Sequence, residues 1–244
     1  MDKIENLLKN LFDANSRHYI RKDIVKRLPS CLLEVMDSEF KFLYPDYYRD
    51  GKVVFIHVPK AAGTSIAETL YGRSITHHTA DHFRKANRKL YSDSFTFSVV
   101  RNPYERLVSA YKFAKAGGTK RVPIRNPELY TGKDFSNFEN FVKNWLVRKD
   151  INNIDFVFQP QWIYVCDKKS KIIVDRLYDV KDLSACEIEL SNQLGHDVFF
   201  PKVNSTGNED YRDYYNDGLV KEVKEIYYKD FEVLPFSEQW ERYF

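Results

Sequence analysis

The residues with the clearest chemical potential lie in a short turn between an apolar run and a helical stretch. The turn reads Pro59-Lys60-Ala61-Ala62-Gly63-Thr64-Ser65. Its small residues let an oxyanion approach the backbone closely, Lys60 adds a positive charge, and the two hydroxyl groups add hydrogen-bond donors. A strand that ends in such a turn and opens a helix presents backbone N–H groups and the positive end of the helix dipole to an anion. The turn therefore predicts a phosphate-type site.

This turn differs from the standard loop that binds nucleoside triphosphates. That loop requires Gly-x-x-x-x-Gly-Lys-Ser/Thr, with the lysine after the second glycine. Here Lys60 precedes Gly63, the only glycine of the turn. Taken by itself, the segment is also compatible with an ordinary strand-to-helix turn.

A second segment strengthens the anion-site interpretation. It reads Arg101-Asn102-Pro103-Tyr104-Glu105-Arg106-Leu107-Val108-Ser109 and follows a second apolar run. Arg101 stands at the predicted strand end, and Ser109 lies two turns into the next helix. Both belong at the carboxyl side of the sheet, where open α/β sheets bind ligands. Arg101 has the paired donors to grip a second phosphate, although an ion pair between Arg101 and Glu105 alone is the competing interpretation.

The elements that must position these residues follow from hydrophobic patterning. Residues 53–57 and 95–100 are short apolar runs typical of buried parallel strands. Each run is followed by a loop and a helical stretch, and the second helix has Asn102 as its cap and ends at Gly117-Gly118. Strand, loop and helix, occurring twice, predict an α/β fold with a central parallel sheet covered by helices.

Weaker local signals predict the other elements of the chain. We expect residues 1–50 to be a helical N-terminal extension, with helices over 2–13 and 20–36, the latter interrupted by Pro29. Residues 51–244 form the main domain. Beyond the second helix we expect these elements: a helix over 135–147, short β runs at 156–158, 161–166 and 172–174, a helix from Asp182 to near Gly195, and a final helix around Leu219, Val223 and Ile226.

Composition bounds the function classes. The 244 residues include 38 Lys and Arg against 35 Asp and Glu, and a net charge of +3 is too small to indicate nucleic-acid binding. Hydrophobic residues make up 43% of the chain, which excludes a disordered protein. Three scattered cysteines argue against a disulfide framework or a structural zinc site and favour a reducing compartment. No stretch approaches the ~20 apolar residues that span a bilayer.

The two anion-site segments resemble motifs of a known enzyme family. The run from His57 to Ser65 is similar to the 5′-phosphosulfate loop of the polysaccharide O-sulfotransferases, and the run from Arg101 to Tyr111 is similar to their 3′-phosphate motif. Looser family elements are found at 158–161, 203–205 and 211–215, so the resemblance covers roughly residues 50–235. It implies the three-layer, P-loop-like sulfotransferase fold and a donor, 3′-phosphoadenosine 5′-phosphosulfate.

The resemblance also implies roles for single residues. Lys60 would neutralise charge on the leaving 5′-phosphate, helped by backbone N–H groups of Ala61, Ala62 and Gly63 and by the Thr64 and Ser65 hydroxyl groups. Arg101 and Ser109 would hold the 3′-phosphate, and Asn204 and Ser205 are expected among the donor-binding residues. Sulfuryl transfer, like phosphoryl transfer, depends on positioning and electrostatics. A sulfuryl group carries less charge than a phosphoryl group, so we expect no metal requirement.

A base for the acceptor hydroxyl is expected in the histidine-rich segment from Ile75 to His82. Histidine suits this role because its unperturbed pKa lies near the working pH of an enzyme. Relatives often place here a histidine that is followed by a small polar residue and an alanine. His78, followed by Thr79 and Ala80, is therefore our choice over His77 and His82. Two other interpretations stay open: His78 and His82 as metal ligands on one helix face, and surface histidines without a chemical role.

The acceptor is expected to be a saccharide hydroxyl. A run of basic residues is a natural wall for an acidic glycan, with Trp162 or Tyr130 as a stacking surface: Lys112, Lys115, Lys120, Arg121 and Arg125. A solvated face is the ordinary interpretation of such a run. Alternative functions are a nucleotide kinase or triphosphatase, and a non-catalytic binder of nucleotides or acidic glycans. We expect a cytoplasmic location, or the Golgi lumen if a membrane anchor preceded this sequence.

Overall fold

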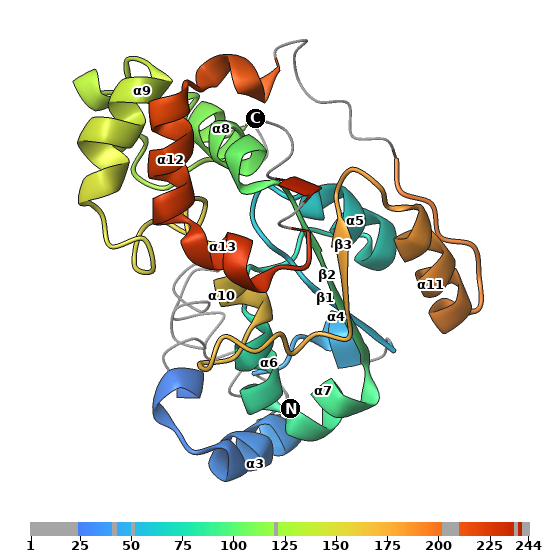
Figure 1. Ribbon diagram of the computed structural model, residues 1–244. Coiled ribbons are helices and arrows are strands. Elements are labelled where there is room, and N and C mark those ends of the chain that lie inside the picture. The colour runs from blue at the N-terminus through green and yellow to red at the C-terminus, as the bar shows by residue number, and fades with distance from the viewer. Residues whose placement is uncertain are drawn as a thin grey trace.

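Three short parallel strands form the centre of the described structure (Figure 1). The structure is a computed structural model that describes residues 24–40, 43–49, 52–119, 122–201, 210–236 and 239–240. The strands are β1 (Val53–Ile56), β2 (Phe95–Val100) and β3 (Arg176–Asp179), in the order β1-β2-β3. Val53 pairs with Phe95, and Phe97 pairs with Arg176. The predicted α/β fold with a central parallel sheet is confirmed.

Helices lie on both sides of the strands, with α5 and α11 on one side and α8, α12 and α13 on the other in the view of Figure 1. The helices near the sheet and the N-terminal part are α3 (Ser30–Phe40), α4 (Asp46–Arg49), α5 (Gly63–Tyr71), α6 (Ala80–Ala86), α7 (Arg88–Asp93) and α8 (Pro103–Lys115). The later ones are α10 (Trp162–Val165), α11 (Ser184–Leu194), η5 (Tyr211–Tyr214), α12 (Asp217–Ile226) and α13 (Tyr228–Val233).

The helix that follows β2, α8, begins and ends as the sequence predicts. The Asn102 side chain accepts a hydrogen bond from the Tyr104 backbone N–H, and Pro103 occupies the first turn of α8. The left-handed Gly117 follows the helix end. α11 ends at the left-handed Gly195, also as predicted.

The predicted helix over 135–147 is present as a continuous helical stretch over 138–148, made of α9 (Phe138–Asn140), the π-helical η3 (Phe141–Trp145) and η4 (Leu146–Arg148). Two short 3-10 turns precede it, η1 (Pro127–Tyr130) and η2 (Lys133–Phe135). One set of predictions for the middle of the chain is wrong. The predicted β runs at 156–158, 161–166 and 172–174 are not strands; Cys166 and Ile172 form an isolated bridge, and α10 occupies 162–165.

The physical reason why residues 161–166 form no strand is a contact from far along the chain. Both carboxylate oxygens of the buried Asp230 accept hydrogen bonds from the backbone N–H groups of Gln161 and Trp162. These are the N–H groups that a helix start leaves without a partner, so Asp230 stabilises a helical turn where local patterning favoured a strand. The actual third strand, β3, carries Arg176 and Asp179 at its ends and lacks the continuous apolar run of a buried strand.

The N-terminal part of the described chain packs into the same core as the sheet. Leu33, Tyr44 and Tyr48 are fully buried or nearly so, and the Tyr48 hydroxyl donates to the backbone oxygen of Phe55 in β1. Residues 24–27 are helical and α3 starts just after Pro29, in agreement with the predicted interruption. The predicted helix over 2–13 lies outside the described residues, and the predicted domain boundary at residue 50 stays a prediction. Among the described helices, none has the length and apolar character needed to cross a membrane.

Asp37 ties this N-terminal part together. Its fully buried carboxylate accepts hydrogen bonds from the backbone N–H groups of Leu43 and Tyr44 and from the Arg49 guanidinium. It also accepts one from the Asn87 amide, which joins α6 to α7. A single carboxylate therefore connects α3, α4 and the start of α7.

We expect Asp37→Ala to lower the free energy of unfolding by about 3 kcal/mol, because it leaves a guanidinium and several N–H groups without their acceptor. Asp46→Ala is the matched control: Asp46 also lies beside Arg49, at 3.6 Å, but its side chain is 69% exposed. The control should change stability by less than about 0.5 kcal/mol. Chemical denaturation measures both, and equal losses would contradict the role of Asp37.

Candidate active site

A cleft of about 2080 Å³ collects most of the predicted site residues. Seven predicted anion-binding residues line it: Lys60, Ala62, Gly63, Thr64, Ser65, Arg101 and Ser109. Ala61 is fully buried. Asn204 and Ser205 lie outside the described residues. The two predicted anion-binding segments thus lie together in space although they are about forty residues apart in the sequence.

The loop between β1 and α5 has an unusual backbone. Lys60 and Ala62 have positive φ angles of 67° and 58°, a left-handed conformation that non-glycine residues rarely adopt. Such conformations cost about 1 kcal/mol or more each and concentrate at functional sites. Ala62 is the N-cap of α5 and offers no side-chain cap, so an anion can accept hydrogen bonds from the first-turn N–H groups.

His57 explains why the loop needs its glycine. A Cβ atom at Gly63 would stand 1.9 Å from the His57 Cδ2 atom, so the imidazole occupies the space of a side chain there. His57 itself is only 7% exposed and stacks against Phe55. Burial, and to a lesser degree the neighbouring His77, holds the pKa of His57 well below its ordinary value. His57 is therefore neutral at neutral pH and packs closely against the loop without adding charge.

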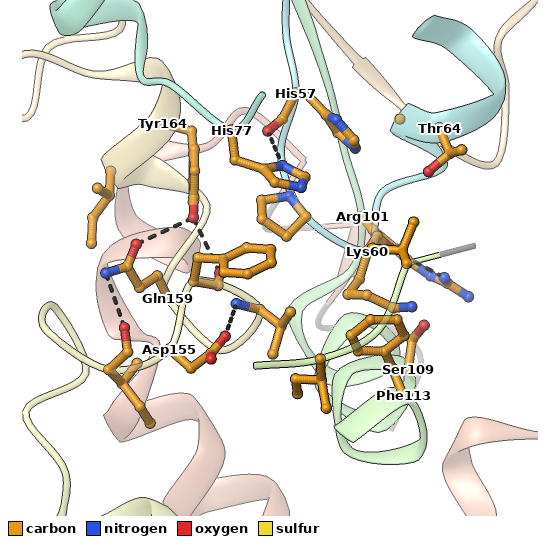
Figure 2. A pocket seen from close by; sticks show the side chains of 18 of the residues that line it. His57, Lys60, Thr64, His77, Arg101, Ser109, Phe113, Asp155, Gln159 and Tyr164 are labelled. Atoms are coloured by element: carbon orange, nitrogen blue, oxygen red, sulfur yellow. Dashed lines mark hydrogen bonds between the residues drawn. The ribbon is translucent and has the colours of Figure 1, made fainter. Parts of the chain in front are cut away.

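Lys60 points its ammonium at an aromatic ring (Figure 2). Its Nζ atom lies 4.2 Å from the centre of the Phe113 ring on α8. Burial, and then the nearby charge of Arg101, lower the pKa of Lys60 to about 8. The side chain is charged at neutral pH and loses its proton within the mildly alkaline range.

Arg101 connects the two anion-binding segments. Its Nη1 atom donates to the Lys60 backbone oxygen at 3.3 Å, and its Nη2 atom donates to Glu105 at 2.8 Å. The ion pair that the sequence left open is therefore present. Arg101 Nε and Glu105 Oε2 are buried and make no hydrogen bond in the described structure. The Arg101 side chain as a whole is 21% exposed, and each Nη atom carries a second N–H besides the one that it donates to Lys60 or Glu105.

The backbone of Arg101 is held by a side chain from another segment. The Gln161 amide accepts from the Arg101 N–H at 2.9 Å and donates to the Arg101 carbonyl at 2.7 Å. Gln161 is fully buried, and its own N–H donates to Asp230. The buried Arg106 guanidinium donates to the carbonyl groups of Val157 and Gln159 and fixes the rest of this segment. Both the N–H and the carbonyl group of Arg101, directly after β2, are thus held by the Gln161 side chain.

Four histidines line the cleft in two pairs: His57 with His77, and His78 with His82. The His77 Nδ1 atom lies 3.1 Å from the His57 carbonyl oxygen, and its ring stacks on Phe156. Because a carbonyl only accepts, Nδ1 carries the proton and the lone pair of neutral His77 lies on Nε2. The His78 and His82 rings stack 4.0 Å apart, and His78 is 3% exposed.

The opposite wall of the cleft comes from residues 154–164. Figure 2 shows Asp155, Gln159 and Tyr164 facing Lys60 and Phe113. Asp155 accepts from the Tyr130 hydroxyl, and Gln159 accepts from the Tyr164 hydroxyl. Of the described residues that line the cleft, ten are Lys or Arg and five are Asp or Glu. The cleft is more positive than the chain as a whole and suits anionic ligands.

The predicted basic run is divided by the fold. Lys112 and Arg125 line the cleft, whereas Lys115 donates to the Ser136 carbonyl away from it. Lys120 and Arg121 lie outside the described residues. Of the two predicted stacking rings, Tyr130 lines the cleft, and Trp162 instead carries Lys229 on its face.

Sequence reasoning did not single out His57, Phe113 or Gln161. Phe113 stands four residues after Ser109, so helical spacing places both on one face of α8 and was a usable signal. His57 directly follows β1, but its contact with Gly63 depends on how the loop folds back. Gln161 is distant in sequence from Arg101, and no local pattern predicts their contact.

The structure also bears on the metal-ligand interpretation of His78 and His82. Across the described ranges, no three or more His, Cys, Asp or Glu side chains gather in a way suited to hold a metal ion. The two rings instead stack face to face and contact Phe83 edge-on.

We expect Gly63→Ala to lower the free energy of unfolding by about 2 kcal/mol, because the added methyl group meets the buried His57 ring. The double variant Gly63→Ala with His57→Ala should recover part of this loss, since it removes the obstructing ring. Denaturation of both single variants and the double variant gives the coupling energy. Simple additivity would show that His57 is not the reason for the glycine.

One family model matches the chain over residues 46–237, and its description is the sulfotransferase family. The match covers most of the chain, including the β1–α5 loop, the end of β2 and α8. No curated protein and no solved structure matched the chain. The matched segment carries both anion-binding segments described above, and the family assigns sulfuryl transfer to it. The chain belongs to the sulfotransferase family.

Proposed function

We propose that this protein transfers a sulfuryl group from 3′-phosphoadenosine 5′-phosphosulfate to a hydroxyl group of a saccharide. The observation that carries the proposal is the joining of two anion-binding segments through one hydrogen bond, from the Arg101 guanidinium to the Lys60 carbonyl. The proposed donor has phosphate groups on both sides of its ribose. Two adjacent cationic sites match that distribution of charge.

The β1–α5 loop suits the side of the donor that reacts. Negative charge grows on the departing 5′-phosphate as the bond to sulfur breaks, and fixed positive groups stabilise it. The Lys60 ammonium and the first N–H groups of α5 supply such groups. The Thr64 and Ser65 hydroxyl groups line the same cleft and act as further donors.

The end of β2 suits the 3′-phosphate. Arg101 lines the cleft with a backbone fixed by Gln161 and with a side chain that is 21% exposed. Ser109 lines the cleft from the next helix. A clamped backbone lowers the entropy cost of holding the guanidinium in place, which favours a defined phosphate site. We further propose Asn204 and Ser205 as donor-binding residues, on the resemblance alone.

The acceptor side is supported by the size and chemistry of the cleft. At about 2080 Å³ it exceeds the volume of roughly 300–1,000 Å³ that a single small ligand occupies, so an oligosaccharide fits beside the donor. Phe156 provides aromatic surface, and Asp155 and Gln159 provide hydrogen-bonding groups, whereas Tyr130 is 3% exposed and offers little surface for stacking.

We propose His78 as the base that takes the acceptor proton, and His77 is the second candidate. His78 lines the cleft beside His82. The observation that favours His77 is its hydrogen bond to the His57 carbonyl, which fixes the ring orientation and leaves Nε2 as the basic nitrogen. Both are compatible with the same reaction.

Arg101→Ala should weaken binding of adenosine 3′,5′-bisphosphate by about 2 kcal/mol, because a charge-assisted contact to the 3′-phosphate is lost. Binding of adenosine 5′-phosphate should change much less. Isothermal titration calorimetry with both ligands measures this selectivity. Equal losses for the two ligands would remove Arg101 from the 3′-phosphate site.

Glu105→Gln is the matched control for Arg101→Ala. It removes the charge of the carboxylate that pairs with Arg101 but keeps the guanidinium and a side chain of the same shape. If Arg101 contacts the 3′-phosphate, Glu105→Gln should retain or strengthen binding of the bisphosphate, because a competing anion is gone. A loss as large as that of Arg101→Ala would mean that the ion pair has a purely structural role.

His78→Ala should lower turnover by roughly 10²–10⁴-fold, the usual worth of a positioned general base, and should leave binding of adenosine 3′,5′-bisphosphate nearly intact. The wild-type rate should fall toward acidic pH, since a protonated ring accepts no proton. It should also fall above pH 8, where Lys60 loses its proton. Transfer of labelled sulfate from the donor to a panel of saccharides measures the rate.

His77→Ala and His82→Ala are the controls and should cost much less. An inactive His77→Ala beside an active His78→Ala would give the role of base to His77. A wild-type protein that binds the bisphosphate but sulfates no saccharide in the panel would contradict the proposed acceptor. If it also failed to consume the donor, it would be a binding protein without this activity.

A further inference from the structure

The ammonium group of Lys60 is held by a ring rather than by a carboxylate. Its Nζ atom lies 4.2 Å from the centre of the Phe113 ring, well within the distance of a cation–π interaction. In the described part of the chain, no Asp or Glu lies within ion-pair distance of Lys60; the carboxylate of Glu105 pairs with Arg101. The main favourable contact of this charge in the donor-free protein is therefore the face of Phe113.

The other charged and titratable groups near Lys60 do not replace that contact. Arg101, at the end of β2, is positive and disfavours a second positive charge beside it. His57, on the same loop, is kept neutral by burial. Lys112, next to Phe113 on α8, lies over the ring of Tyr214, 4.9 Å from its centre.

Among the groups on other elements that line the cleft, Figure 2 shows His77 and Asp155 across from Lys60. His77 is engaged with the His57 carbonyl and the Phe156 ring. Asp155 accepts hydrogen bonds from the Tyr130 hydroxyl and from the backbone N–H of Val157 on the far wall of the cleft. No described element brings a carboxylate within ion-pair distance of Lys60.

We propose that Phe113 is a positioning residue that holds the Lys60 ammonium, in its charged form, at the site where the 5′-phosphate departs. The inference rests on the proposed function, because it assigns Phe113 a part in the same reaction. Phe113 would touch neither the donor's reacting atoms nor the acceptor; it acts through Lys60.

A neutral ring suits this task better than a carboxylate. A carboxylate in an ion pair with Lys60 would neutralise the charge that the transition state needs, and the developing anion would have to displace it. An aromatic face attracts the ammonium through its quadrupole and carries no net charge. It also offsets part of the burial that lowers the pKa of Lys60. The ring thus keeps the lysine oriented and protonated while leaving its full charge for the donor.

The position of Phe113 on α8 connects the Lys60–Phe113 cation–π contact with the proposed 3′-phosphate site. Ser109 and Phe113 are four residues apart and lie on the same face of the helix. One rigid helix, capped by Asn102 directly after β2, thereby carries a predicted 3′-phosphate contact and the support of Lys60. The two sites keep a fixed separation without any direct contact between their side chains.

The test weakens the ring's quadrupole without changing its shape. Phenylalanine at position 113 is replaced by mono-, di- and trifluorinated phenylalanine, and the pKa of Lys60 is measured in the donor-free protein. Trace labelling with acetic anhydride over a pH series, read out by mass spectrometry of the Lys60 peptide, reports the neutral amine directly. We expect the pKa to fall in steps with each fluorine, by about half a pH unit in total.

Conventional variants provide a second measurement. Phe113→Leu should lower the pKa of Lys60 at least as far as the trifluorinated ring, and Phe113→Trp should restore or raise it. In the pH profile of kcat/KM, the decrease at alkaline pH should begin at lower pH in Phe113→Leu. In Phe113→Trp it should begin at the wild-type pH again. A residue that only packs would leave the pH of this decrease unchanged.

Tyr214→Leu is the matched control, because Tyr214 holds Lys112 on its ring as Phe113 holds Lys60 but lies outside the lining of the main cleft. It should leave the pKa of Lys60 unchanged. A pKa that does not respond to fluorination, or that responds equally to Tyr214→Leu, would overturn the role of Phe113. By contrast, Lys60→Ala with full turnover would overturn the proposed function of Lys60 while the labelling result still stood.

Discussion

The organising constraint of this cleft is the half-buried positive charge of Lys60, which has no carboxylate of its own within the described structure. The proposed reaction uses Lys60 as an unneutralised cation, so the surrounding fold has to keep it charged by other means. Glu105, the nearest carboxylate on α8, is engaged by Arg101, and the Phe113 ring takes the place of a counter-ion. The lowered pKa of Lys60, about 8, is the remaining cost of this arrangement. The left-handed backbone at Lys60 and Ala62 is a second cost, concentrated in the same loop.

The sequence was sufficient for the parts of the fold that rest on local signals. β1 is a continuous apolar run and β2 is mainly apolar, and α8 has a cap, a proline and a terminal glycine in their proper places. It was insufficient where a distant side chain decides the backbone. The carboxylate of Asp230 accepts hydrogen bonds from the backbone of Gln161 and Trp162 at the start of a helix. The buried Asp179 at the end of β3 accepts a hydrogen bond from the distant Trp240.

The candidate site shows the same division. Lys60, Arg101 and Ser109 were readable because each lies at a fixed place relative to a strand end or helix start, where topology brings them together. The residues that support them were not, because their contacts join segments far apart in sequence. Gln161 acts on the backbone of Arg101 across sixty residues, and His57 acts on Gly63 through the curvature of the loop. Motif spacing predicts which groups lie together in the cleft, whereas packing between distant segments determines which groups support them.

The two hydrogen bonds from the Gln161 side chain to the Arg101 backbone have a consequence for the order in which the parts of the site are completed during synthesis. β1, its loop, β2 and α8 are all complete by residue 115, yet both backbone groups of Arg101 are bonded by Gln161, and Gln161 is held in turn by Asp230 on α13. Trp240, near the end of the described chain, then joins Asp179 at the end of β3 and lies within hydrogen-bond distance of Asn102. An emerging chain that already carries both anion-binding segments therefore still lacks the supports that set their geometry. The supports of both segments are complete only once α13 and Trp240 have been synthesised.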